Sequence, residues 1–154
     1  MNNPYQAPAA ELVTDDQEHL YVGFWPRFGA QIIDGIIVAI ITYPILFLVY
    51  GTGYFTKTTL VLGPLDVVLN YVFPIAWTLA FWIYRQATPG KMVIGAKIIS
   101  AKTGGKPTPG QLVGRYFAYI LSALPLLLGY LWAAWDPKKQ TWHDKLAGTY
   151  VVRN

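Results

Sequence analysis

Cysteine is absent from the 154 residues, and this absence excludes several kinds of site. Without a thiol the chain can form neither a disulfide framework nor a thiolate metal site, and it has no cysteine nucleophile. Charge is also scarce, because Asp, Glu, Lys and Arg make up 13% of the residues whereas hydrophobic residues make up 54%. This balance is typical of an integral membrane protein.

The first residues lack both a basic start and an apolar run. The stretch "MNNPYQAPAAELVTDDQEHLYVG" has four acids, two prolines and no Lys or Arg. A signal peptide needs a basic region followed by an apolar one, so this stretch does not resemble one. We expect residues 1–21 to form a flexible polar tail and residues 22–153 to form the membrane domain.

Three apolar segments follow the tail: Phe24–Tyr50, Val67–Tyr84 and Tyr116–Trp135. A helix that crosses a bilayer needs about 20 apolar residues, so the first two segments are expected to be full spans. The third is broken by Pro125. Its two halves are of re-entrant rather than spanning length, so we expect two short helices hinged near this proline.

Basic residues are concentrated in two parts of the chain. Residues 85–115 carry six Lys or Arg and no acid, and residues 136–154 carry four more, whereas residues 51–65 contain only Lys57. By the positive-inside rule, both basic parts and both termini are expected on the cytoplasmic side of a bacterial inner membrane. The third apolar segment must then enter and leave on the same side; a third span is the alternative.

Two short runs have the alternation of β-strands. Residues 93–100 contain β-branched residues and precede a "TGG" turn, and the chain ends with "GTYVVR". Pairing these runs would form a small cytoplasmic sheet. The expected fold is therefore an all-α integral membrane protein with two transmembrane helices, a proline-hinged re-entrant hairpin or third span, and this sheet.

The stretch "RFGAQIID" places an acid inside the first apolar segment. Asp34 lies two helical turns after Arg27, too far for a direct ion pair. Arg27 can extend to the headgroups, but an ionised Asp34 in the membrane would cost at least about 2.5–3.5 kcal/mol. Asp34 is thus either a neutral residue that makes a packing hydrogen bond or a group that handles an ion or proton. The second reading is the default for an intramembrane acid.

Asp66 and His143 are secondary candidates for an ion-binding or transport site. Asp66 is expected to be a helix N-terminal acid, and "TPGK" at 88–91 lacks the glycine spacing of a P-loop and is expected to be a turn. His143 beside Asp144 suggests a metal site or a triad, but no further His or Cys accompanies them. We expect no enzyme activity, metal or cofactor. The basic residues that give the formal charge of +4 lie in loops between apolar runs and not on one soluble face, so no nucleic-acid partner is expected.

Three ordered motifs resemble the RDD family of small bacterial membrane proteins: "PRFGAQIIDGII", "TPGKMVIGAKIIS" and "QTWHDKLAGTYVV". The family is named for one arginine and two aspartates, and the resemblance assigns these to Arg27, Asp34 and Asp144. It implies that Asp144 folds back toward Arg27 at the cytoplasmic surface. An Arg–carboxylate pair there would be bidentate and partly desolvated.

The resemblance implies transport, with sodium/proton antiport associated with some family members. We expect a small transporter of an ion or solute, such as a cation/proton antiporter. In it Asp34 alternates between protonated and ion-bound forms, while Arg27 and Asp144 control the cytoplasmic mouth. Two spans are too few to enclose a pathway, so a homo-oligomer in the lipid bilayer is expected, with a monovalent cation and a proton as ligands. The alternative is a non-transporting adaptor whose basic loop binds a partner or anionic lipid.

Overall fold

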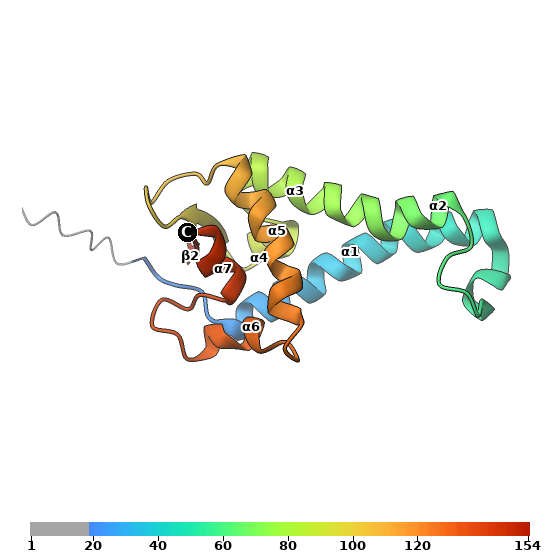
Figure 1. The fold of residues 1–154 in the computed structure, drawn as a ribbon. Helices are drawn as coiled ribbons and strands as arrows, with labels where there is room; N and C mark the ends of the chain where they lie inside the picture. Colours follow the sequence, from blue (N-terminus) through green and yellow to red (C-terminus); the bar gives the residue numbers. More distant parts are fainter. Residues whose placement is uncertain (1–18) are drawn as a thin grey trace, which may run out of the picture.

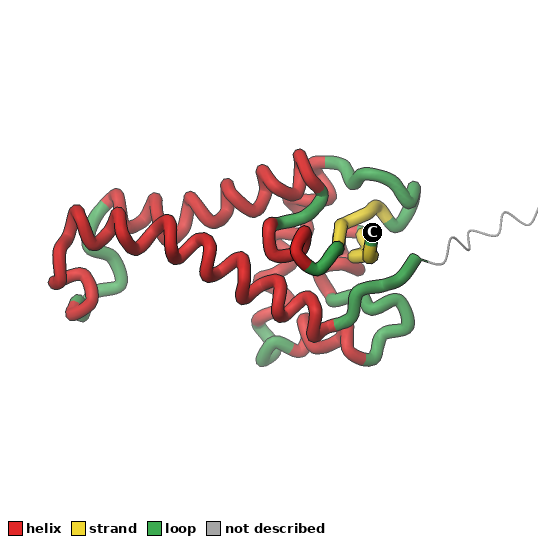
Figure 2. Tube along the Cα trace, turned by 180° about the vertical axis from the view of Figure 1, so that it is seen from behind, coloured by secondary structure: helices red, strands yellow, loops and turns green. Residues whose placement is uncertain are grey.

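A long helical hairpin extends from a compact end that carries the other helices and the sheet (Figures 1 and 2). The computed structural model describes residues 19–154, so residues 1–18 of the predicted tail lie outside the described part. One arm of the hairpin is α1 (Phe24–Tyr50). The other arm consists of α2 (Pro64–Val67), a π-helical turn η2 (Val68–Val72) and α3 (Phe73–Arg85).

Both arms are long and apolar enough to cross a membrane. The first helical stretch, Phe24–Thr56, has 33 residues and includes the 3-10 helix η1 (Gly51–Thr56) at the tip; the second, Pro64–Arg85, has 22. The two expected spans are confirmed as helices of spanning length. Large apolar side chains point outward along both arms, as they do in helices that face lipid, among them Ile36, Ile40, Leu48, Val68 and Val72.

Proline marks the irregular points of both arms. Pro44 stands inside α1, where it cannot donate the hydrogen bond of an ordinary helical residue. Pro74 occupies the start of α3, directly after the π-helical turn. A π-turn inserts an extra residue between hydrogen-bonded groups, and such turns absorb local irregularity within a helix.

The third apolar segment is bent, as its proline predicted. The helix α5 (Pro109–Ala123) starts seven residues before the expected position, because a capping box of Thr108 and Gln111 initiates it. After a break come α6 (Leu128–Leu131) and the 3-10 helix η3 (Trp132–Ala134), inclined at 113° to α5. The hinge is confirmed; whether the segment re-enters or crosses stays a prediction.

The predicted sheet is present at the compact end. β1 (Ala96–Ser100) pairs antiparallel with β2 (Thr149–Arg153), with Ile98 opposite Val151. Tyr21 forms a bridge with Val152, so the end of the predicted tail lies against the sheet. One core cluster joins the sheet to α3 and α5 through these buried residues: Val22, Trp82, Ala96, Ile98, Leu112 and Val151.

The pairing of β1 with β2 generates a prediction about membrane sidedness. Cysteines introduced as Lys106→Cys and Arg153→Cys should both be labelled by a membrane-impermeant maleimide from the cytoplasmic side, because both flank the same sheet and belong to basic segments. Thr58→Cys, near the exposed tip of the hairpin, should be labelled from the other side. Labelling of positions 106 and 153 from opposite sides would contradict the re-entrant arrangement.

Candidate functional site

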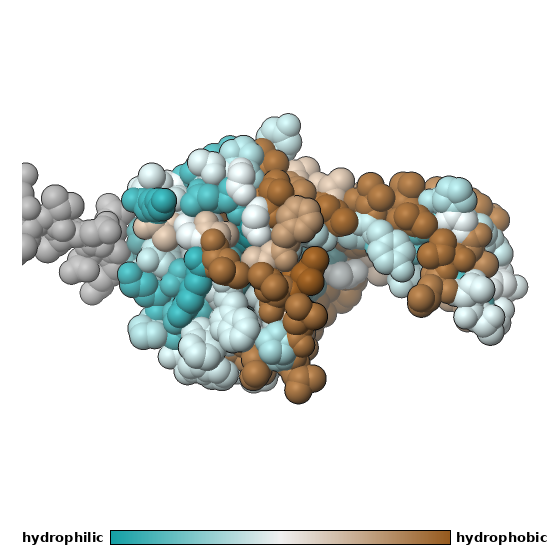
Figure 3. All heavy atoms as spheres, viewed as in Figure 1, coloured by the Kyte–Doolittle hydropathy of each residue, from teal (hydrophilic) through white to brown (hydrophobic). Residues whose placement is uncertain are grey.

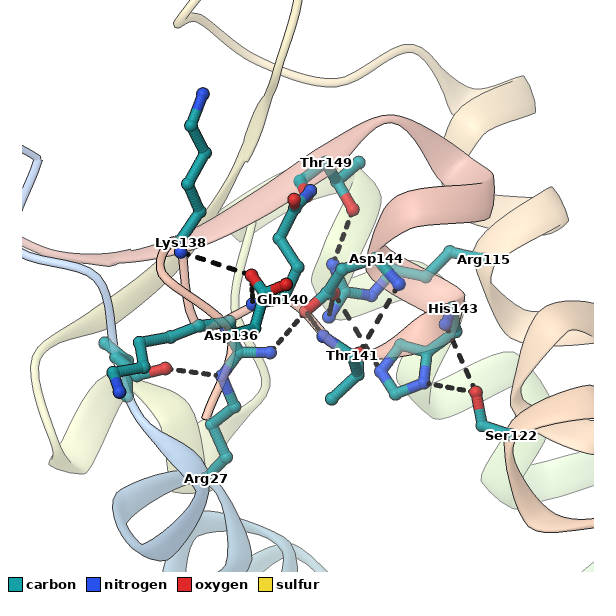
Figure 4. Close-up of polar contacts among 12 residues, drawn as sticks. Arg27, Arg115, Ser122, Asp136, Lys138, Gln140, Thr141, His143, Asp144 and Thr149 are labelled. Atoms are coloured by element: carbon teal, nitrogen blue, oxygen red, sulfur yellow. Dashed lines mark hydrogen bonds and ion pairs between the residues drawn. The ribbon is translucent and has the colours of Figure 1, made fainter. Parts of the chain in front are cut away.

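Asp144 lies at the centre of a buried ion cluster at the compact end (Figure 4). Its side chain is 0% exposed; Arg27 Nη1 donates to Oδ2, and Arg115 Nη2 lies 2.6 Å from Oδ1. The expected contact between Arg27 and Asp144, 117 positions apart, is confirmed. The expected bidentate geometry is wrong, because the two arginines take one carboxylate oxygen each.

The remaining donors of the two arginines bind backbone and hydroxyl groups. Arg27 Nε donates to Val22 O at 2.8 Å, and its Nη2 donates to Lys139 O at 2.6 Å. Arg115 Nη1 donates to Thr149 Oγ1 at 2.8 Å. The cluster therefore joins α1, α5, β2 and the short helix α7 (Trp142–Ala147), which carries Asp144.

The sequence analysis missed Arg115, although a signal for it exists. The buried residues of α5 are Leu112, Arg115, Ala118 and Ser122, which follow helical spacing on one face. A basic residue on the buried face of an otherwise apolar helix requires a buried acid as its partner.

Hydrogen bonds at the start of α7 fix the position of the Asp144 carboxylate. Thr141 accepts a hydrogen bond from the Asp144 backbone N–H, and Asp144 Oδ2 accepts one from the Thr141 backbone N–H at 3.1 Å. This capping box holds the helix start and the carboxylate in one arrangement. Burial alone would raise the pKa of Asp144, but Arg115 and Arg27 bring it well below its usual range, so the carboxylate is ionised.

His143 is a hydrogen-bonded core residue. Its Nδ1 lies 3.0 Å from Ser122 Oγ, and its ring packs edge-on against Tyr119 with the centroids 4.0 Å apart. Burial holds the pKa of His143 well below its usual value, which keeps the imidazole neutral. These contacts explain the residue without a metal or a triad.

Asp34 binds the start of a short helix. The helix α4 (Pro89–Val93) begins after Thr88, and Asp34 accepts hydrogen bonds from Thr88 Oγ1 and, at 2.7 Å, from the Gly90 backbone N–H. A Cβ atom at Gly90 would lie 2.0 Å from Ala30 O, so α1 and α4 are in direct backbone contact. These contacts favour the packing alternative for Asp34.

Asp66 belongs to a separate cluster at the far end of the hairpin. It stands in the first turn of α2, as predicted, and is 1% exposed. Its carboxylate accepts hydrogen bonds from the Leu62 backbone N–H at 2.8 Å and from Lys57 Nζ and Tyr54 OH at 3.0 Å each. The structure thus brings Arg27 and Asp144 together, while Asp34 and Asp66 each have partners of their own.

A cavity of about 370 Å³ lies beside the arginine cluster. Among its lining residues are the cationic side chains of Arg27, Lys91 and Arg115. Lys91 is 4% exposed, and within residues 19–154 its ammonium makes no hydrogen bond or ion pair; it lies over the Trp82 ring, 5.2 Å from the centroid. In the same part of the chain, Arg115 Nε is buried without a hydrogen-bond partner.

Burial, together with the nearby Arg115 and Arg27, lowers the pKa of Lys91 to about 7, although Asp34 and Asp144 act in the opposite direction. Lys91 can therefore gain or lose a proton near neutral pH. The sequence analysis missed it because "TPGK" has the composition of a turn. Only the contact between α1 and α4 places this lysine in the interior.

The arginine cluster predicts strong coupling between Arg27 and Asp144. Asp144→Ala should lower the free energy of unfolding in detergent by about 3–5 kcal/mol, because it leaves two guanidinium groups buried without a carboxylate. Arg27→Ala should cost less, because Arg115 still pairs with Asp144. In the double mutant the loss should be much smaller than the sum. Arg27→Lys should not rescue, because one ammonium cannot reach Asp144, Val22 O and Lys139 O together.

The pair of Lys145 and Asp136, in which only the lysine is exposed, is the control. The Lys145 side chain is 43% exposed, so its coupling with Asp136 should stay below about 1 kcal/mol. Strict additivity of Arg27→Ala and Asp144→Ala, within about 0.5 kcal/mol, would show that the two residues do not stabilise one another.

The close contact of α1 and α4 predicts different responses at two glycines. Gly90→Ala should destabilise the protein by about 1–3 kcal/mol, because the new Cβ would collide with the backbone of α1. Gly114→Ala, in α5, should be neutral or stabilising by up to about 1 kcal/mol, because its Cβ would meet nothing within 4 Å. Equal unfolding midpoints for the two variants would contradict the contact.

Comparison with known proteins finds a family model and several relatives. The model of the RDD family matches residues 21–148. The chain is 35% identical to the uncharacterized protein YxaI of Bacillus subtilis over 84% of this chain and 95% of that one. It is 34% identical to the uncharacterized membrane protein YteJ of the same organism, over 93% of this chain and 85% of that one. No solved structure matches. Since the family match covers most of the chain, this protein belongs to the RDD family.

Proposed function

We propose that this RDD-family membrane protein binds a small anionic solute on the basic side of its cavity and moves it across the membrane together with a proton. The observation that carries the proposal is a pair of buried donors. Lys91 Nζ and Arg115 Nε line one cavity and, among residues 19–154, have no hydrogen-bond acceptor. Buried polar groups are almost always paired, so an acceptor-rich ligand would complete the site.

The charges around the cavity favour an anion over a cation. Arg27 and Arg115 face Lys91 from α1 and α5, and Asp144 on α7 is already bound by both arginines. Asp34 accepts hydrogen bonds at both carboxylate oxygens. The other polar lining residues carry no charge, so cationic groups outnumber the acids that remain available. They are Gln31, Tyr119, Tyr130, Thr141 and the neutral His143.

Proton coupling follows from the same geometry. An anion beside Lys91 stabilises the ammonium and raises the lysine pKa from about 7, so anion binding takes up a proton near neutral pH. Carrying the anion with a proton lowers the net charge that must cross the bilayer. Since one chain has two helices of clear spanning length, we place the pathway in a homo-oligomer in a bacterial inner membrane, with the basic end cytoplasmic.

Cation/proton antiport through Asp34 is supported less well. A carboxylate that exchanges cations must release its protein partners, whereas Asp34 holds the start of α4 against α1. A non-transporting adaptor is the other candidate, and the exposed Lys102 and Lys106 beside the sheet favour it. Those two lysines could bind an acidic partner without any use of the cavity.

The pH dependence of anion binding tests the proposal. Hexyl sulfate is a suitable probe, because its single charge does not titrate between pH 6 and 8. Its affinity for the purified protein should fall about tenfold between these values, as the unliganded Lys91 loses its proton. Lys91→Met should weaken binding and flatten the profile, whereas Lys106→Met, at an exposed turn, should change neither. Binding by Lys91→Met with the parent's affinity and profile would overturn the proposal.

Proteoliposomes separate the remaining alternatives. A hexyl sulfate gradient should drive proton movement in the parent protein and not in Lys91→Met. Sodium-driven proton movement that Asp34→Asn abolishes would instead support cation/proton antiport. Movement under neither gradient would support the adaptor.

A further inference from the structure

The cavity combines a charged interior with an apolar mouth. Arg27, Lys91 and Arg115 line its interior, and the last two are almost fully buried. Phe28 and Leu126, which also line it, are 49% and 89% exposed. A ligand that fits this combination has an anionic end and an apolar end.

The surface around the mouth is apolar. Figure 3 shows a hydrophobic area over α5 and the bend that follows it. An exposed apolar surface of this kind on a folded protein marks contact with a membrane or a partner. The α5–α6 pair also has the composition of a membrane segment, and we infer that the mouth faces hydrocarbon. The exposed side chains of this area are Phe117, Ile120, Leu121, Leu124, Leu126 and Leu127.

The backbone holds the mouth in a fixed shape. Leu126 and Leu127 have φ angles of 50° and 64°, in the left-handed region that non-glycine residues rarely adopt. The following turn is tightly packed, because a Cβ atom at Gly129 would lie 2.5 Å from Ser122 Cα. Two adjacent leucines in this conformation are costly.

We propose that the ligand is an anionic membrane lipid, whose headgroup enters the cavity sideways from the bilayer while its acyl chains stay outside against the bend. This inference rests on the proposed anion binding and adds the class of ligand. The volume of about 370 Å³ lies within the range of small-molecule sites, about 300–1,000 Å³, and suits a headgroup rather than a whole lipid.

The charges of the site distinguish among headgroups. A phosphodiester offers oxygens to Lys91 Nζ and Arg115 Nε, two cationic donors of the cavity lining that have no acceptor among residues 19–154. A zwitterionic choline headgroup would bring a further cation next to Arg27 and Arg115, and like charges in a low-dielectric site repel strongly. The site should therefore prefer phosphatidylglycerol to phosphatidylcholine.

Native mass spectrometry of the full chain in a nonionic detergent tests the inference with three probes: phosphatidylglycerol, phosphatidylcholine and methyl sulfate, an anion without a chain. Each chain should bind one molecule of phosphatidylglycerol. Its affinity for this lipid should be at least tenfold higher than for either of the other two probes. Lys91→Met should remove this preference.

Two rim variants test the mouth. Leu126→Asn and Leu127→Asn remove the apolar contact. Asparagine tolerates the left-handed conformation that these two positions adopt, so the backbone can stay as it is. Both should weaken phosphatidylglycerol binding severalfold and leave methyl sulfate binding unchanged. Leu48→Asn, an equally exposed leucine on the distant part of α1, should have no effect on either.

The outcomes separate this inference from the proposed function. Methyl sulfate binding as tight as phosphatidylglycerol binding, with both lost in Lys91→Met, would overturn lipid recognition and leave the anion site intact. Equal binding of phosphatidylglycerol and phosphatidylcholine, unaffected by Lys91→Met, would overturn lipid recognition at this cavity. If hexyl sulfate also failed to bind, the anion site itself would be overturned.

Discussion

One ionised carboxylate between two guanidinium groups determines how the compact end is assembled. Asp144 has no exposure to solvent, and Arg27 and Arg115 reach it from α1 and α5. Desolvation of buried ions costs several kcal/mol each, so the arrangement is stable only if the charges meet in good geometry with their other groups hydrogen-bonded. The bonds of Arg27 to Val22 O and Lys139 O meet that condition. The cluster thereby selects which segments of the chain come together.

The same cluster connects structure with the proposed chemistry. One aspartate shared by two arginines leaves positive charge in excess, and Lys91 adds to it on the wall of the same cavity. Asp34 does not balance this charge fully, because its oxygens hold the first turn of α4. The two motif aspartates therefore have distinct structural tasks, and the pKa of Lys91, in the cavity lining, lies near 7. We therefore propose an anion as the ligand in place of a cation.

Much of the fold could be predicted, because its signals are local. Span length, the break at Pro125 and the alternation of the two strands each depend on neighbouring residues, and the structure has helices, hinge and sheet at these places. The start of α5 was misplaced by seven residues, because hydropathy marks where a helix becomes apolar and not where a capping box begins it. The contact of Arg27 with Asp144 came from the RDD motifs and not from spacing.

The sequence by itself determined the class of protein, its two spans, the hinge and the strand pair, because hydrophobicity and backbone preference act over a few residues. Only the tertiary structure decided the site. Arg115 and Lys91 read as ordinary basic residues until α5 and α4 pack against α1 and bury them beside the cavity. Burial and the pKa of a group depend on neighbours that are distant in the chain, so no local pattern could have assigned these two residues their environment.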